Sequence, residues 1–330
     1  MRIKRITPLC LCIMLLIAWH VRADEPSCPK AGDGCVQVGE WDVSVGLGIG
    51  RRTNPVISND DIPIYILPSI SYYGERLFWE TDTIGFTLLE SPRSLFNVIT
   101  TVSYGQTYFN DWGIGNFSIE GGSGRSGSSL SLQSESDGQV SGALVSPNEN
   151  FDGGQVADPA GDGDGALGAP IVDDGDSEII DLDALHERDM AALAGFEYLY
   201  DYKNLGVSLQ VLKDISGVHN GMQVRTGLAT YLSHQKHGYT FSVGAEWKDS
   251  ETQDYYYGVR LDELENDNLA YIVDDDWSYY AKFDWRYQVS KHWEWRAIIH
   301  HRWLGDEIKN SPLVNEATTS AVFFGGVYHF

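Results

Sequence analysis

The chain ends in TSAVFFGGVYHF, residues Thr319–Phe330, in which aromatic residues occupy alternate positions at Phe324, Tyr328 and Phe330. Phe324, Tyr328 and Phe330 lie on one face of the strand that this pattern predicts, because successive side chains of a strand point to opposite faces. A strand of about ten residues can cross a membrane as part of a β-barrel. It could also be the last buried strand of a soluble β-sandwich, so the rest of the chain must distinguish the two.

The same alternation recurs along the chain, most clearly at Trp41–Gly50, where large apolar residues alternate with Asp, Ser and Gly. Small and polar residues opposite an apolar stripe suit a solvated or tightly filled barrel interior better than the apolar core of a sandwich. The alternation predicts about twelve strands, within a range of roughly ten to fourteen. The candidates are 41–50, 63–73, 77–88, 96–104, 190–202, 205–211, 224–232, 239–247, 255–261, 277–289, 293–303 and 319–330.

Charged residues occupy the inner face of some of these strands. Lys282, Asp284 and Arg286 alternate with aromatic residues, which is costly in a dry core but natural in a barrel lumen, where charges pair or meet water. After residue 23 no apolar run approaches the roughly 20 residues that a membrane-spanning helix needs. Lipid cannot satisfy the backbone of an open sheet. The sequence therefore predicts an all-β fold: a transmembrane, antiparallel, up-and-down β-barrel.

The N-terminus carries export features. Arg2, Lys4 and Arg5 precede a short apolar run and a small-residue cleavage pattern, which predicts a secretory signal peptide over residues 1–23. We expect a periplasmic leader over 24–40 and the barrel over 41–330.

The leader contains two cysteines, Cys28 and Cys35. In an oxidising compartment such a close pair predicts one small disulfide loop. Half of a metal site is the alternative, but no histidine or further cysteine lies near them. The predicted signal removes four basic residues and no acidic one from a chain of net charge −24, so the mature chain carries −28. This charge argues against nucleic acid as a partner.

Residues 113–189 differ from the rest of the chain. They contain sixteen acidic residues, two basic residues and fifteen glycines. Such a stretch buries too little apolar surface to offset its ordering entropy, so we expect a largely disordered acidic insertion. Twelve spanning strands would place this insertion in the periplasm, whereas the tight turn at Lys203–Asn204 would place it outside the cell. The conflict is relieved if 255–261 belongs to a loop, which favours the outside.

Several short stretches resemble one family. Leu67–Pro68, Tyr72–Arg76 and Phe78 are similar to the early hairpin of the MltA-interacting protein/OmpV family, and Trp303–Asp306 resembles its penultimate strand. The residues that match its motifs most closely are Tyr257, Gly258 and Val259, followed later by Ser311 and Pro312. The resemblance covers most of 41–105 and 190–330, and the acidic insertion departs from it.

This resemblance implies a barrel in the bacterial outer membrane, surrounded by lipid and lipopolysaccharide. Some family members are described as scaffolds that join a lytic transglycosylase to a murein synthase, and others as porin-like barrels. The final strand, with Phe330, Tyr328 and Phe324, also resembles the signal that the barrel-assembly machinery recognises. The family carries no catalytic motif that could be transferred to this chain.

The sequence itself indicates no catalytic, cofactor or metal site. His300 and His301 are adjacent and should point to opposite faces. His234 and His237 flank a turn, and His219–Gly221 is better explained as a turn than as part of a phospholipase motif. Asn148–Gly153 begins like a calcium loop, but Pro159 stands where the last ligand should be. We therefore expect a non-catalytic scaffold for murein machinery; a channel for small solutes is the alternative, and an outer-membrane hydrolase ranks below both.

Overall fold

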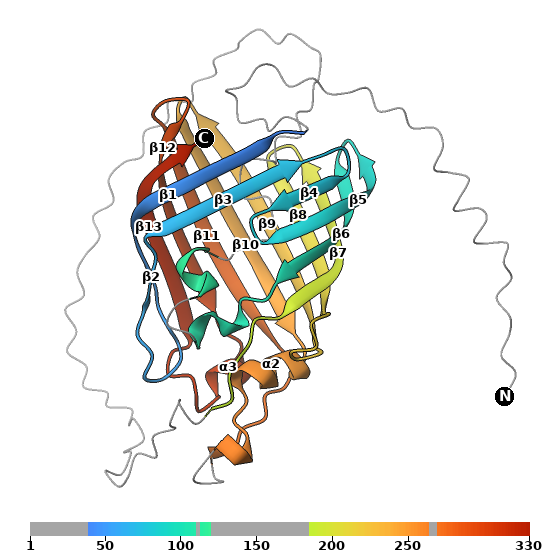
Figure 1. The fold of residues 1–330 in the computed structure, drawn as a ribbon, viewed down its shortest axis with the longest axis vertical. Helices are drawn as coiled ribbons and strands as arrows, with labels where there is room; N and C mark the ends of the chain where they lie inside the picture. The colour runs from blue at the N-terminus through green and yellow to red at the C-terminus, as the bar shows by residue number, and fades with distance from the viewer. Residues whose placement is uncertain (1–38, 110–112, 120–184, 264–268) are drawn as a thin grey trace, which may run out of the picture.

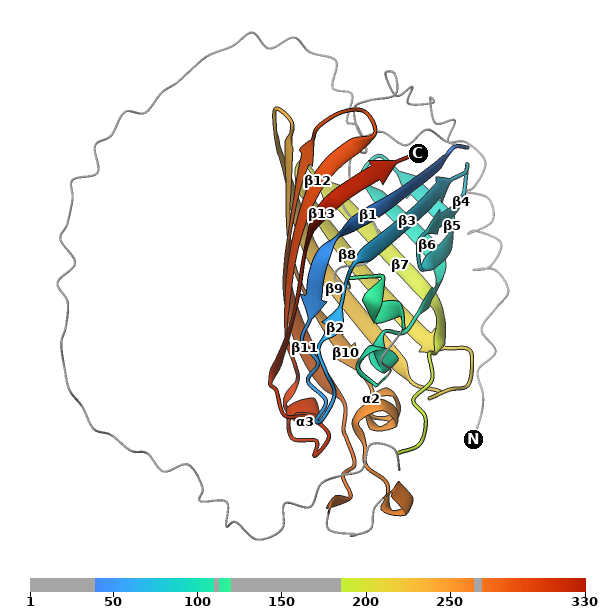
Figure 2. The same cartoon turned by 60° about the vertical axis from the view of Figure 1, so that its left-hand side comes forward.

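A computed structural model describes residues 39–109, 113–119, 185–263 and 269–330. These residues form an antiparallel sheet that closes on itself (Figures 1 and 2). Twelve strands make the barrel wall, and β2 is a two-residue addition beside β1. The strands are β1 (Trp41–Arg52), β2 (Ile62–Pro63), β3 (Ile66–Tyr73), β4 (Leu77–Glu80), β5 (Thr83–Ser91), β6 (Ser94–Val102), β7 (Ala192–Tyr202), β8 (Leu205–Asp214), β9 (Met222–His234), β10 (His237–Lys248), β11 (Asp276–Gln288), β12 (Trp293–Trp303) and β13 (Thr318–His329).

The barrel closes where the last strand meets the first. β13 pairs with β1 over nine residue pairs, from Ser44↔His329 to Arg52↔Ala321. Glycines permit this close approach: a Cβ at Gly48 would lie 2.3 Å from the Phe324 carbonyl oxygen, and one at Gly325 would lie 2.4 Å from that of Leu47. The ring of Phe323 covers both glycines on the inner face. The final stretch of sequence is therefore the seam of the barrel.

The alternating faces predicted from the sequence are confirmed. Large apolar residues of the strands point outward and are exposed, including Ile49, Phe196, Phe241, Ile299 and Phe324. The alternate positions, such as Asn97, Glu197, Gln210 and Asp284, are buried inside. An apolar outer band around a polar interior is the arrangement that lipid requires of a barrel.

The predicted number of twelve strands is correct, but two of the predicted strands are wrong. One of them is really two strands, and another is not a strand, so the total is unchanged. The segment 77–88 is not one strand, because β4 ends at Glu80 and the chain reverses at Thr81–Asp82 before β5. Thr81 has a φ of 36°, the left-handed conformation of a tight turn. Apolar alternation continues across this turn, so the pattern alone did not reveal it.

The second error is the strand predicted at 255–261. Ser250–Tyr257 forms helix α2, whose first backbone amides are capped by Asp249: its carboxylate accepts from the amide nitrogen of Thr252. Three consecutive tyrosines, Tyr255–Tyr257, produced the misleading pattern. Val259 pairs only with Tyr271, in an isolated bridge. This segment is therefore a loop, as the turn at Lys203–Asn204 required.

The predicted strand at 63–73 also needs a correction. Its regular part begins at Ile66. Ile64 does not share the face of Ile66, because it is fully buried in an inner cluster with Ile298, Ala321 and Phe323. Leu47 pairs with Ile66 whereas Arg51 pairs with Pro63, so the register against β1 shifts by one residue between β2 and β3. This shift turns the side chains of the two segments to different faces.

The two ends of the barrel differ. Connections of two to four residues at 74–76, 92–93, 203–204, 235–236 and 289–292 form the turn end, uppermost in Figure 1, where the C-terminus also lies. The opposite, loop end carries 53–65, 103–191, 215–221, 249–275 and 304–317. Helices α2 and α3 (Asp306–Lys309) cover this end (Figure 2). None of the described helices is long and apolar enough to cross a membrane.

Some predictions concern residues outside those described. These are the signal peptide, the leader up to residue 38 with Cys28 and Cys35, the calcium-like loop, and the insertion over 120–184. The two ends of the predicted insertion, 113–119 and 185–189, are described and have defined neighbours.

Candidate functional site: the lumen and its cap

The chain that follows β6 turns into the lumen. Its short helices η1 (Gly105–Tyr108) and η2 (Ile114–Asn116) lie inside the barrel (Figure 2). Arg52 of β1 donates to the Ser118 carbonyl oxygen at 2.7 Å, and Asn116 donates to that of Pro63 at 3.1 Å. We call residues 103–119, as far as they are described, the inner segment. It occupies the loop half of the lumen.

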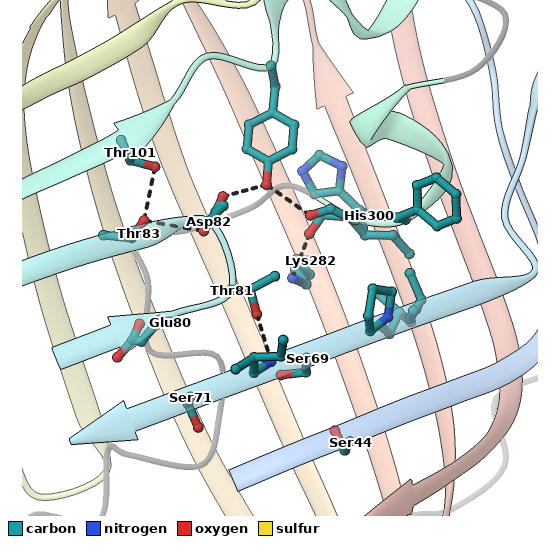
Figure 3. Close-up of a pocket in the computed structure, with 18 of the residues that line it drawn as sticks. Ser44, Ser69, Ser71, Glu80, Thr81, Asp82, Thr83, Thr101, Lys282 and His300 are labelled. Atoms are coloured by element: carbon teal, nitrogen blue, oxygen red, sulfur yellow. Dashed lines mark hydrogen bonds between the residues drawn. The ribbon is translucent and has the colours of Figure 1, made fainter. Parts of the chain in front are cut away.

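A cavity of about 260 Å³ lies beside the inner segment, toward the turn end. Figure 3 shows the hydroxyl-bearing side chains that enter it from β3, β5 and β6, including Ser69, Ser71, Thr83 and Thr101. Tyr104 of the inner segment donates its hydroxyl hydrogen to Asp82, and Thr83 donates to the same carboxylate at 3.2 Å. One wall of the cavity is therefore rich in hydroxyl groups and carboxylates.

The opposite wall carries a cluster around Glu246. Its carboxylate accepts from Arg302 and from Arg225, the latter at 3.0 Å, and Lys248 lies 3.4 Å away. Three cations thus surround one carboxylate. The three cations compensate the buried charge of the Glu246 carboxylate. They also leave an excess of positive charge on this wall.

A second cluster surrounds Asp284 in the same wall. Arg296 contacts its carboxylate at 2.5 Å, and Arg286 lies 3.8 Å from it. Arg286, Arg296 and Tyr280 point inward and line the cavity. The basic residues that line the cavity are Arg225, Lys248, Lys282, Arg286, Arg296 and Arg302; the acidic ones are Asp42, Glu80, Asp82, Glu246 and Glu294.

Apolar side chains close the loop end above the inner segment. Phe109 packs against three clusters of buried residues, centred on Tyr256 and Tyr257, on Val56 and Ile62, and on Val259 and Leu313. These clusters join the loops 53–65, 249–275 and 304–317. No described residue of those three loops lines the cavity. We call this apolar layer the cap.

The two motifs singled out in the sequence meet in the cap. Ser311 donates its hydroxyl hydrogen to the Tyr257 carbonyl oxygen at 2.6 Å and accepts from the amide nitrogen of Leu313. Gly258 ends α2 in a position where a Cβ would lie 2.4 Å from the Asp254 carbonyl oxygen. Val259 packs on Leu313, the residue after Pro312. The motif residues hold two loops together, which is a structural arrangement and not a reactive one.

A buried ion pair fastens the end of the insertion to the cap. Arg188 contacts Glu263 at 3.0 Å, with both side chains almost fully buried, and donates to the Gly258 carbonyl oxygen at 3.1 Å. Burial alone would raise the pKa of Glu263. Hydrogen bonds from the Arg260 backbone, from the Arg188 side chain and from His186 outweigh it and lower the pKa to about 2. Burial also raises the pKa of the neighbouring Tyr256 to about 12.

The histidines do not assemble into a site. His219 belongs to a turn in which the Asp214 carboxylate accepts backbone hydrogen bonds, and Asn220 adopts a φ of 58°. Burial lowers the pKa of His219 despite the nearby Asp214 carboxylate. Because its Nδ1 accepts from the Gly221 amide at 3.0 Å, the ring proton lies on Nε2. The turn predicted at this position is confirmed.

The two other histidine pairs noted in the sequence lie on barrel strands. His300 points into the cavity, whereas His301 lies on the outer side, where its Nδ1 is 2.7 Å from the Ser320 hydroxyl. Their opposite orientation is confirmed. His234 and His237 face each other across a turn, and Trp285 donates to His237. The described residues contain no group of three or more metal-ligating side chains that could hold an ion.

The three C-terminal residues expected in the assembly signal lie on the outer face or at the rim. Phe324 stacks on Trp295 with ring centres 5.5 Å apart, and Tyr328 contacts Trp293 at 5.1 Å. Phe330 remains 76% exposed, and its amide donates to the Val43 carbonyl oxygen at 3.0 Å. These side chains extend the apolar band across the seam.

Comparison with known proteins identifies the family. The sequence profile described as MltA-interacting protein MipA matches residues 45–330. The chain belongs to the MipA family. The match covers the seam, the inner segment and the cap, and the resemblance seen in short motifs is thereby confirmed. The closed barrel with its apolar outer band places this MipA-family protein in the bacterial outer membrane. No curated protein matches the chain.

Solved structures similar to the chain include three barrels. OprG of Pseudomonas aeruginosa is 10% identical, with a TM-score of 0.19, and the match covers 43% of this chain and 79% of that one. A loop-deletion mutant of OmpT, an outer membrane protein of Vibrio cholerae, is 9% identical, with a TM-score of 0.30 and coverages of 89% and 100%. The CymD monoaromatic hydrocarbon channel is 11% identical, with a TM-score of 0.30 and coverages of 89% and 88%. These values are too low to assign a solute or a partner.

Proposed function

We propose that this protein is a non-catalytic outer-membrane barrel that binds enzymes of murein metabolism at its periplasmic end. The observation that carries the proposal is the cap: apolar side chains around Phe109 close the loop end. A barrel closed in this way is better suited to holding a partner than to conducting solutes. The family description, MltA-interacting protein, supports a murein-degrading transglycosylase as that partner.

The turn end offers the docking surface for this partner. Outer-membrane barrels have short periplasmic turns and longer external loops, so we infer that the turn end faces the periplasm. Each of its five turns carries one exposed basic residue, and only Glu75 opposes them within the turns. The basic residues are Arg76, Arg93, Lys203, Lys236 and Lys291.

The charge of the loop end is opposite. Among its described residues and the Thr81–Asp82 turn, fifteen are acidic and three are basic. A basic ring on a protein of net charge −24 is a local departure from its composition. Complementary charges steer association and orient partners. We therefore assign the ring to recognition of an acidic protein surface in the periplasm.

Affinity capture from solubilised envelopes tests this proposal. The tagged mature protein should retain a lytic transglycosylase, identified by its degradation of purified murein. Changing the five basic turn residues to Gln should reduce its capture about tenfold or more, because several charge pairs are lost together. The control changes Arg260 and Lys309 at the loop end to Gln. Failure of the unmodified protein to retain any murein enzyme would contradict the proposal.

A channel for small solutes is the second candidate. Six basic and five acidic residues line the cavity, and charged, polar lumens are typical of conducting barrels. In this case the cap would have to open. Planar-bilayer recordings distinguish the two functions, since a closed barrel produces no conductance steps.

A further inference from the structure

The barrel wall is interrupted beside β3. β3 pairs with β1 along Ile66–Tyr72, but on its other edge it pairs with β4 only through Ser71–Tyr73. The four-residue β4 then ends and the chain turns back at Thr81–Asp82. Within the described part of the chain, no strand pairs with this edge of β3 over Ile66–Ser69. We call the interruption between this edge and the Thr81–Asp82 turn the window.

Such an edge is unfavourable against lipid, because hydrocarbon provides no hydrogen bonds to backbone groups. The Thr81–Asp82 turn relieves part of this cost: the Thr81 amide donates to the Ile70 carbonyl oxygen at 2.7 Å, and the Ile70 amide donates to the Thr81 hydroxyl at 3.4 Å. The rest of the edge must face polar groups. The hydroxyl-bearing side chains of Ser69, Thr83 and Thr101 line the cavity beside this edge (Figure 3).

The cavity reaches the barrel wall beside the window. On the other strands, only inward-facing residues line it. On β3 its lining includes inward-facing Leu67 and Ser69 together with Pro68 and Ile70. Pro68 and Ile70 pair with Val45 and Val43 of β1 and share their outer, lipid-facing side. The lining of the cavity therefore includes residues of both faces of β3 at the window.

Lys282 is the cation that enters the cavity from the opposite wall without a counter-ion (Figure 3). Among the described residues it forms no ion pair, and its one hydrogen bond, to the Ile119 carbonyl oxygen, is 3.4 Å long. The nearby carboxylates are engaged elsewhere, Asp284 by Arg296 and Asp82 by Tyr104. An inward-facing charge without a partner is costly, and an anion would remove that cost.

We propose that the window admits a membrane amphiphile with a single anionic head group, a carboxylate or a phosphate. The head group passes Ser69 and Thr81 and pairs with Lys282, while its acyl chain stays in the lipid beside Pro68 and Ile70. A cavity of about 260 Å³ falls just below the usual range of small-molecule sites, which begins at about 300 Å³, so it suits a head group and not a whole two-chain lipid. This site is independent of partner binding at the turn end.

Binding of fluorescent amphiphiles to the refolded mature protein, in nanodiscs of phosphatidylcholine, tests the proposal. The probes are dansyl-undecanoate, a dansyl-labelled lysophosphatidylglycerol and, as a neutral control, dansyl-undecanol. We expect saturable binding of at least one anionic probe. Lys282→Met should weaken it about tenfold or more, the usual scale for a lost charged hydrogen bond. Lys213→Gln is the matched control, because Lys213 is exposed and donates to the Asn220 carbonyl oxygen outside the lumen.

A second variant tests the route. Ser69→Trp places a large side chain on the inner side of the window and should slow association of the anionic probe at least several-fold, while the altered migration of the unheated protein in gels confirms that the barrel is folded. Binding of the carboxylate probe alone identifies a fatty acid as the ligand class, and binding of the phosphate probe alone identifies a lysophospholipid. Absence of saturable binding, equal affinity in Lys282→Met, or equal binding of the neutral probe would overturn the proposal.

Discussion

At the scale of single residues, the chemistry of this barrel is that of buried charges and their partners. Glu246 and Asp284 each hold several cations within the lumen, and Glu263 holds Arg188 in the cap. Removing one member of such a group leaves an uncompensated buried charge, which costs more than the pair contributes. The stability of each charged group in the polar interior therefore depends on the presence of its partners.

The Arg188–Glu263 pair gives a pH-dependent prediction. The pKa of Glu263 falls from 4.5 to about 2 in the folded chain, so its ionised form is the one that the fold stabilises. This contribution is complete above about pH 4.5 and is lost as the pH falls toward 2. A spin label at Glu187→Cys should therefore remain immobile at pH 5 and become mobile as the pH falls to about 2.

Glu263→Gln is the control for this experiment. It leaves Arg188 buried without a counter-ion, so the label should already be mobile at neutral pH and show no acid transition. A label that stays immobile at pH 7 in Glu263→Gln would contradict the role assigned to the ion pair.

At the scale of elements, the inner segment fills the loop half of the lumen. It enters the lumen after β6 and positions Phe109 at the junction of three apolar clusters. The loops that contact it come from separate parts of the chain. The cap is therefore formed by tertiary contacts among several loops, and no single loop closes the barrel alone.

Phe109→Ala should weaken this closure. Loss of the ring leaves a cavity where three clusters meet, so we expect conductance steps in planar bilayers that the unmodified protein lacks. Phe196→Ala removes a phenylalanine ring from the lipid face instead. This variant should show no conductance steps. A folded Phe109→Ala protein without conductance would show that the inner segment closes the lumen by other contacts.

At the scale of the whole molecule, the two ends of the barrel carry opposite charge. The turn end carries a basic ring, the loop end is acidic, and the seam between β1 and β13 closes the wall between them. Closure satisfies the backbone of the first and last strands together. The barrel is therefore complete only when the C-terminal strand has paired with β1.

Phe330→Ala tests the predicted assembly signal. Because Phe330 is largely exposed and makes one backbone hydrogen bond, the purified variant should unfold at nearly the same temperature as the unmodified protein. Its yield in the outer membrane should fall several-fold if the terminal ring is recognised during assembly. Leu89→Ala, at another exposed outer position, is the control. Equal yields of the two variants would contradict the signal.

The sequence determined the barrel, its two faces and its seam, because strand alternation is a local property that survives in the order of residues: Trp41–Gly50 and Thr319–Phe330 each show it unaided. It also located the motif residues of the family, but not their contact, since Tyr257 and Ser311 meet only through folded loops. The short β4, the inner segment and Lys282, which forms no ion pair with the described residues, came from the tertiary structure alone. Pairing edges, lumen filling and the absence of a counter-ion depend on neighbours that are distant in the chain, and no local pattern encodes them.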